Sequence, residues 1–76
     1  MKRYTVHIVL EGNQKRVRLN GKERFDSFTA VGIAQDEVEY NRRNKIRGTV
    51  FIKDEVSKNI ICMWETKEGY IEQSIF

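Results

Sequence analysis

The sequence has no proline, one cysteine and one histidine among its 76 residues. A single cysteine excludes a disulfide framework, and together with one histidine it cannot supply a Cys/His zinc site. The scarcity of cysteine favours a reducing, cytoplasmic setting. No apolar run approaches the ~18 residues of a membrane span, and residues 1–11 lack the cleavage site of a signal peptide. We therefore expect no metal, no membrane partner and no secretion.

Leucine and alanine are also scarce, at four residues together, whereas valine and isoleucine total 15. Helical domains are rich in leucine and alanine, and sheets favour branched side chains. A chain of this length, 39% hydrophobic and 33% charged, has room for one small domain with a small core. We expect a single domain over residues 1–76 that is mostly strand.

The N-terminal region has the pattern of a β-hairpin. Residues 4–10 and 15–19 alternate apolar and polar side chains, and Gly12-Asn13 between them suits a tight type II′ turn. Cross-strand partners share a face of the sheet, so this register leaves His7 and two arginines on the polar face. The expected pairs are Ile8 with Val17 and Val6 with Leu19.

One helix is expected, from about Ser27 to Asn44. Asp26 or Ser27 is a suitable N-cap, and basic residues suit the C-terminal end of the helix dipole. Gly32 within the segment lowers its helix propensity. Apolar side chains recur at three- and four-residue spacing, which predicts the buried stripe. The residues of this stripe are Phe28, Val31, Ala34 and Val38; Ile33 and Tyr40 are expected to point away from it.

Three strands are expected after the helix, at residues 49–53, 59–65 and 70–76, separated by polar turns. The whole chain then has the order ββαβββ, an antiparallel α+β domain with a helix on the sheet. The predicted pairs are Ile52 with Ile60, Val50 with Cys62, Trp64 with Ile71, and Ile60 with Ile75.

The residue set argues against catalysis. His7 lies mid-strand with no recognisable partner base or nucleophile, and Cys62 alternates with core residues. The carboxylates of Asp36, Glu37 and Glu39 sit beside arginines and read as a solvated helix face. The glycines form neither a dinucleotide nor a phosphate-binding motif. We expect no enzyme activity and no cofactor.

Positive charge is concentrated in the first part of the chain. Residues 1–48 contain 11 Lys/Arg and six Asp/Glu, a balance of +5, whereas residues 49–76 contain three and five, a balance of −2. Arginine predominates, and its planar guanidinium suits phosphate. The alternative interpretation is a solvated surface. The leading functional prediction is nucleic-acid binding through Arg16, Arg18, Arg42, Arg43, Lys45 and Arg47.

The second functional prediction rests on excess apolar residues. The strands after the helix are apolar on both faces, whereas a sheet with one wet face should alternate. Either the N-terminal hairpin covers the second face, or the face binds another protein or a second copy of the chain. The anchors of this interface would be Phe51, Ile61 and Met63.

Overall fold

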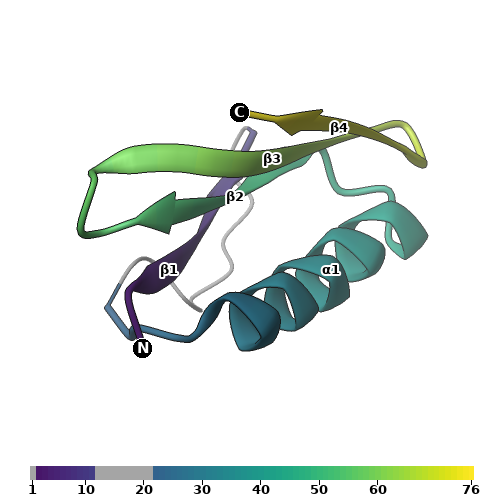
Figure 1. Ribbon diagram of the computed structural model, residues 1–76. Helices are drawn as coiled ribbons and strands as arrows, with labels where there is room; N and C mark the ends of the chain where they lie inside the picture. The colour runs from purple at the N-terminus through teal and green to yellow at the C-terminus, as the bar shows by residue number, and fades with distance from the viewer. Residues whose placement is uncertain (1, 12–21) are drawn as a thin grey trace.

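The computed structural model describes residues 2–11 and 22–76. Its elements are β1 (Tyr4–Leu10), α1 (Ser27–Arg43), β2 (Gly48–Asp54), β3 (Asn59–Lys67) and β4 (Tyr70–Ile75) (Figure 1). The strands form one antiparallel sheet in the order β1-β2-β3-β4. Helix α1 packs on one face of this sheet, and the opposite face carries no described element (Figure 1). The predicted α+β class is confirmed.

The predicted order ββαβββ fits only approximately, since the described elements run βαβββ. The expected second strand at 15–19, with Val17 and Leu19 as partners of β1, lies outside the described residues. Within the described part, β1 pairs with β2 along its whole length, from Tyr4 opposite Asp54 to Leu10 opposite Gly48. The chain therefore passes through α1 between these two strands, and β2 lies beside β1.

The boundaries of α1 agree with the predicted helix to within one residue. Asp26 is the N-cap, and its Oδ1 accepts a hydrogen bond from the amide of Thr29 at 2.8 Å. At the other end, the Asn44 side-chain amide donates to the carbonyl of Tyr40 at 2.8 Å. The Asp26 cap thus satisfies an amide that has no partner inside the helix, and the Tyr40 carbonyl also accepts from the Asn44 backbone amide at 3.1 Å.

Of the four residues predicted in the buried stripe of α1, two are buried and two are exposed. Ala34 and Val38 are buried, but Phe28 is 90% exposed and Val31 is 38% exposed. The helix turns the small residue Ala30 to the sheet, and Phe28 lies about 200° around the helix from it at 100° per residue. Ile33, expected to point away, packs against the core. The buried residues of α1 are Ala30, Ala34, Glu37, Val38 and Asn41.

The core lies between α1 and the helix-facing side of β1, β2 and β3. Alternate residues of each strand point into it, as the two-residue period of a strand requires. Branched side chains predominate, with one large aromatic ring on β3. The buried strand residues of this cluster are Val6, Ile8, Val50, Ile52 and Trp64.

The predicted register of β2 with β3 is wrong by two residues. Ile52 lies opposite Cys62 and Val50 lies opposite Trp64. The turn accounts for one residue, because Asp54 pairs with Asn59 and only residues 55–58 form the turn. A bulge adds the second: Lys53 pairs with Ile60 and Ile52 with Cys62, so Ile61 is left without a partner on β2. Cys62 and Trp64 keep their predicted face, because a shift of two restores the alternation. Ile60 does not: it lies opposite Lys53, on the face away from α1, and Ile75 pairs with Cys62 rather than with Ile60.

The register of β3 with β4 is also displaced. Ile71 was expected opposite Trp64 but lies opposite Thr66, and Gln73 takes the place beside Trp64. The turn contains two residues, Glu68 and Gly69, with φ of +52° and +91°. Two consecutive left-handed residues are typical of the type I′ hairpin turn, which is tighter than the four-residue loop expected.

Candidate nucleic-acid and protein interfaces

The basic residues predicted to bind nucleic acid divide into two groups. Arg16 and Arg18 lie outside the described residues. The other four occupy the last turn of α1 and its connection to β2. Backbone hydrogen bonds hold this segment, from the Lys45 amide to the Arg42 carbonyl at 3.2 Å and from the Ile46 amide to the Asn41 carbonyl at 2.8 Å. The four are Arg42, Arg43, Lys45 and Arg47, here called the basic turn.

Two members of the basic turn are already paired. Arg42 forms an ion pair with Glu39, one helical turn earlier. The Arg47 Nε lies 3.2 Å from a carboxylate oxygen of Glu11, and a second guanidinium nitrogen lies 4.0 Å from Glu68. All of these side chains are between 41% and 76% exposed. Exposed ion pairs of this kind contribute little to stability, so these arginines can exchange partners.

The other two members, Arg43 and Lys45, are exposed. Among residues 2–11 and 22–76, no carboxylate forms an ion pair with either of them. Within the part of the chain that the structure describes, the basic turn therefore presents two cations that form no ion pair, flanked by two whose partners are at the surface. Glu39, which pairs with Arg42, is also close enough for Arg43 to contribute to the lowering of its pKa.

A second feature lies on the sheet face opposite α1, here called the open face. A single cross-strand row passes through His7, Phe51, Met63 and Ser74, one residue from each strand. The rings of His7 and Phe51 stack with centroids 4.6 Å apart and planes 2° apart. His7, Phe51 and Met63 are each half-buried. Two of the three predicted apolar anchors thus lie side by side on this face.

The third predicted anchor, Ile61, does not lie on the open face. It was expected on the open face, directly opposite Phe51, but Phe51 pairs with Met63. As the extra residue of the bulge, Ile61 breaks the alternation of β3 and packs against the core cluster beneath α1. His7 takes its place beside Phe51. The sequence alternation places His7 on the polar face of the N-terminal hairpin, and it does not predict that this face continues into the Phe51 face of β2.

Charged residues border the apolar row toward β4. The Lys67 ammonium lies 3.5 Å from a Glu65 carboxylate oxygen and 3.9 Å from one of Glu72. Both carboxylates raise the pKa of Lys67. With more acids than bases here, this edge repels phosphate, so the open face is a poorer surface for nucleic acid than the basic turn.

Thr5, His7 and Glu55 form a polar cluster at the other end of the open face. The Thr5 hydroxyl donates to Glu55 Oε2 at 2.8 Å and lies 2.8 Å from His7 Nε2. A nucleophile would instead donate to the imidazole and be open to a substrate, whereas Thr5 is 1% exposed. This cluster is structural. Sequence reasoning missed it because Glu55 is 50 residues from Thr5.

Arg3 and Asp54 form a two-point ion pair between the chain before β1 and the end of β2. The Arg3 guanidinium donates to Oδ1 at 2.9 Å and to Oδ2 at 2.6 Å. Asp54 Oδ1 also accepts from the Val56 amide at 2.9 Å. These hydrogen bonds, led by that from Arg3, hold the pKa of Asp54 well below its ordinary value.

Replacing Asp54 with asparagine should reduce the dependence of stability on acid pH. Because the folded-state pKa is lowered, the contribution of Asp54 is present above its unfolded pKa of about 4 and is lost as pH falls further. We expect Asp54→Asn to melt below the wild type at pH 7, with a gap that narrows toward pH 2. Thermal melts across this range test it, and a constant gap would contradict it.

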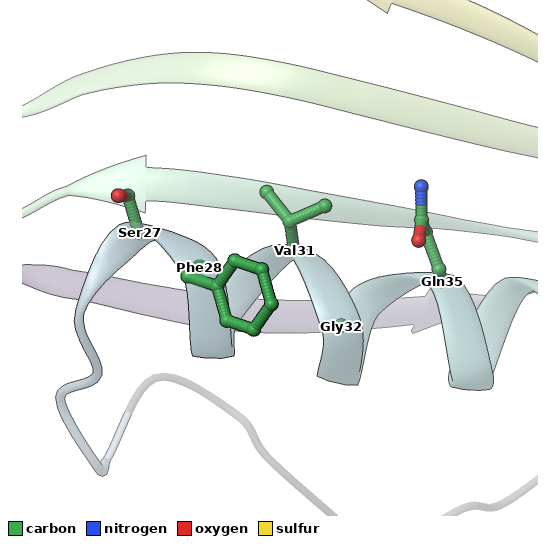
Figure 2. Close-up of a pocket in the computed structure, with 5 residues that line it drawn as sticks. All are labelled: Ser27, Phe28, Val31, Gly32 and Gln35. Carbon is green, nitrogen blue, oxygen red and sulfur yellow. The ribbon is translucent and has the colours of Figure 1, made fainter.

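One shallow pocket lies beside the first turns of α1, lined by Ser27, Phe28, Val31, Gly32 and Gln35 (Figure 2). Its side chains carry no charge and offer one hydroxyl and one carboxamide. In the described part of the chain, no group of three potential metal ligands occurs. Nor is any helix there long and apolar enough to cross a membrane.

Comparisons with protein-family models, with curated proteins and with solved structures find no match to this chain. The functional argument therefore rests on the basic turn and the open face.

Proposed function

We propose that this chain is a non-catalytic nucleic-acid-binding module that contacts the phosphate backbone through the basic turn. The observation that carries the proposal is the placement of Arg43 and Lys45, exposed and without an ion-pair partner in the described residues. Arg42 and Arg47 add two cations whose present partners are surface carboxylates. The net charge of +3 favours the same class of ligand.

Binding of this kind contacts the phosphate backbone of the nucleic acid rather than the edges of its bases. The sequence around the basic turn contains two asparagines, residue types that recognise adenine edges. Asn41 is fully buried, however, and the Asn44 amide already donates to Tyr40. Phosphate contacts position a protein without specifying sequence, so we expect similar affinity for unrelated sequences.

The salt dependence of binding tests the proposal. Four phosphate contacts predict a log–log slope of about −3.6 on duplex DNA. Fluorescence anisotropy with short duplex, single-stranded DNA and RNA probes at about 50 mM salt and above would measure it. Arg43→Glu should weaken binding and reduce the magnitude of the slope by at least about 1. Absence of binding to all three probes would overturn the proposal.

Lys58→Glu is the matched control for Arg43→Glu, because each substitution changes the net charge by the same amount. Lys58 lies in the turn between β2 and β3, at the end of β2 remote from the basic turn, and pairs with Glu55. The control should bind more tightly than Arg43→Glu. Equal losses would mean that total charge, rather than the basic turn, determines binding.

A second candidate function is protein binding through the open face. The stacked His7 and Phe51 rings with Met63 beside them, bordered by charged residues, have the composition of an interface centre and rim. This is the predicted apolar interface with His7 in place of Ile61. It uses a different surface from the basic turn, so one chain could carry both functions.

Phe51→Lys separates an interface from a core. Phe51 is half-buried on the face without α1, so the variant is expected to remain folded, with the circular dichroism of the wild type. If the open face binds a second copy, the variant should also have a smaller mass in solution. Complete unfolding would show that Phe51 belongs to an intramolecular core and would contradict the open face as a binding surface.

A further inference from the structure

Strand β4 is the last strand of the described sheet and pairs only with β3. All six of its residues are exposed. An edge strand presents a row of backbone donors and acceptors that can pair with another strand. We propose that a second copy of this chain binds here, with the two β4 strands antiparallel about a two-fold axis at Gln73.

The hydrogen bonds of β4 identify which backbone groups are available. The Phe76 amide donates to the Ile61 carbonyl on β3 at 3.1 Å. Successive residues of an antiparallel strand direct their backbone groups to opposite sides. Glu72 and Ser74 therefore face β3 with Phe76, whereas the residues between them face outward. The outward set is Ile71, Gln73 and Ile75.

This pattern selects one register for the second copy. With the axis at Gln73, Ile71 lies opposite Ile75 of the second copy and Gln73 lies opposite its own counterpart. All three outward residues then form hydrogen-bonded pairs, two bonds for each pair, as antiparallel geometry allows. An axis at Glu72 or Ser74 would pair only two of the three outward residues, because the third would lie opposite the β3–β4 turn or beyond Phe76.

Charge supports the same register. With the axis at Gln73, each Glu72 lies opposite Ser74 of the second copy. Moving the axis to Glu72 would place the two Glu72 carboxylates directly opposite each other, which is destabilising. The self-complementary order of residues around Gln73 thus fits a second copy in particular.

The apolar side chains of β4 point to the same occupant. Ile75 is 79% exposed, Phe76 70% and Tyr70 51%. The register sets Tyr70 opposite Phe76 of the second copy and pairs the isoleucines on the side of the sheet that faces α1. A domain this small has little core of its own, and oligomerisation is a common source of additional burial.

Pairing through β4 joins the two sheets without occupying either open face. Each apolar row ends at Ser74 on β4. The rows of the two copies therefore meet at the β4–β4 contact and become parts of one eight-stranded sheet. The inference thus goes beyond the proposed function and is tested without nucleic acid.

Site-specific cross-linking tests the register. In a Cys62→Ala background, Gln73→Cys should form a disulfide-linked dimer under mild oxidation, because hydrogen-bonded partners are about 5.5 Å apart at Cα. Glu72→Cys is the matched control. In this register the two residues at position 72 are diagonal neighbours, about 7–8 Å apart, so Glu72→Cys should cross-link far less. Equal cross-linking of both cysteines would overturn the register.

Gln73→Pro tests the edge itself. Proline removes an outward amide and leaves the bonds to β3 intact, as edge positions tolerate. The wild type should have twice the 9.0 kDa of one chain, about 18 kDa, by sedimentation. Gln73→Pro should be monomeric and Gln73→Thr dimeric. A wild type that remains monomeric at millimolar concentration, or a dimer that only Phe51→Lys dissociates, would overturn the proposal.

Discussion

Truncation of Trp64 to alanine should lower the free energy of unfolding by about 3–5 kcal/mol. The Trp64 side chain is 5% exposed and lies on β3 opposite Val50, facing α1. Its removal leaves a large cavity that the surrounding branched side chains cannot fill. Small domains are stable by as little as about 5 kcal/mol, so a substantial fraction of this variant should be unfolded. Urea denaturation followed by circular dichroism measures the loss.

Phe28→Ala is the control for this experiment. It removes an aromatic ring that the sequence pattern assigned to the core but that is 90% exposed. The expected change is within about 0.5 kcal/mol, as for other surface substitutions. Similar losses for the two variants would show that Phe28 contributes to the core and that the helix orientation described here is incorrect.

Gly48→Ala should destabilise the protein by about 1–3 kcal/mol, the usual effect of overpacking. Gly48 begins β2 opposite Leu10. A Cβ added there would lie 2.7 Å from the Val9 carbonyl oxygen and 2.9 Å from Leu10 Cδ2. The closer atom belongs to the backbone of β1, which the β1–β2 pairing holds in place. Valine at this position should be still more destabilising.

Gly32→Ala should have the opposite sign. Gly32 is in the interior of α1, and a Cβ there meets no atom within 4 Å outside the local helix backbone. Alanine favours the helix by roughly 0.5–1 kcal/mol over glycine. The two substitutions should therefore shift the midpoint of chemical denaturation in opposite directions.

A stabilising Gly48→Ala would mean that β1 and β2 are farther apart than the structure has them.

The features predicted well from sequence were those determined by neighbouring residues. The start of α1 follows from the Asp26 cap, and the polar turns marked the strands after the helix to within two residues. The four cations of the basic turn lie near one another because they fall within residues 42–47; their role in binding stays a prediction.

The features predicted poorly depend on turn length, a bulge and the orientation of the helix. The alternation of apolar and polar residues does not determine these. The strand registers differ from the predicted ones because both turns are shorter than expected, at residues 55–58 and 68–69, and because Ile61 occupies a bulge. The orientation of α1 could not be fixed, because Phe28 and Ala30 both satisfy helical spacing on different faces. The contacts of Arg47 with Glu11 and of Thr5 with Glu55 join residues far apart in sequence, so no local pattern identifies them.

The pairing of β1 with β2 has a consequence for the order in which the chain folds. Turns of four and two residues join β2, β3 and β4, whereas Leu10 and Gly48 are 38 residues apart. Closing a long loop costs entropy before the contacts can compensate. We therefore expect the three C-terminal strands to pair first and β1 to join them last. During synthesis β1 is made first, so it cannot form its pairs with β2 until residues 48–54 have emerged from the ribosome.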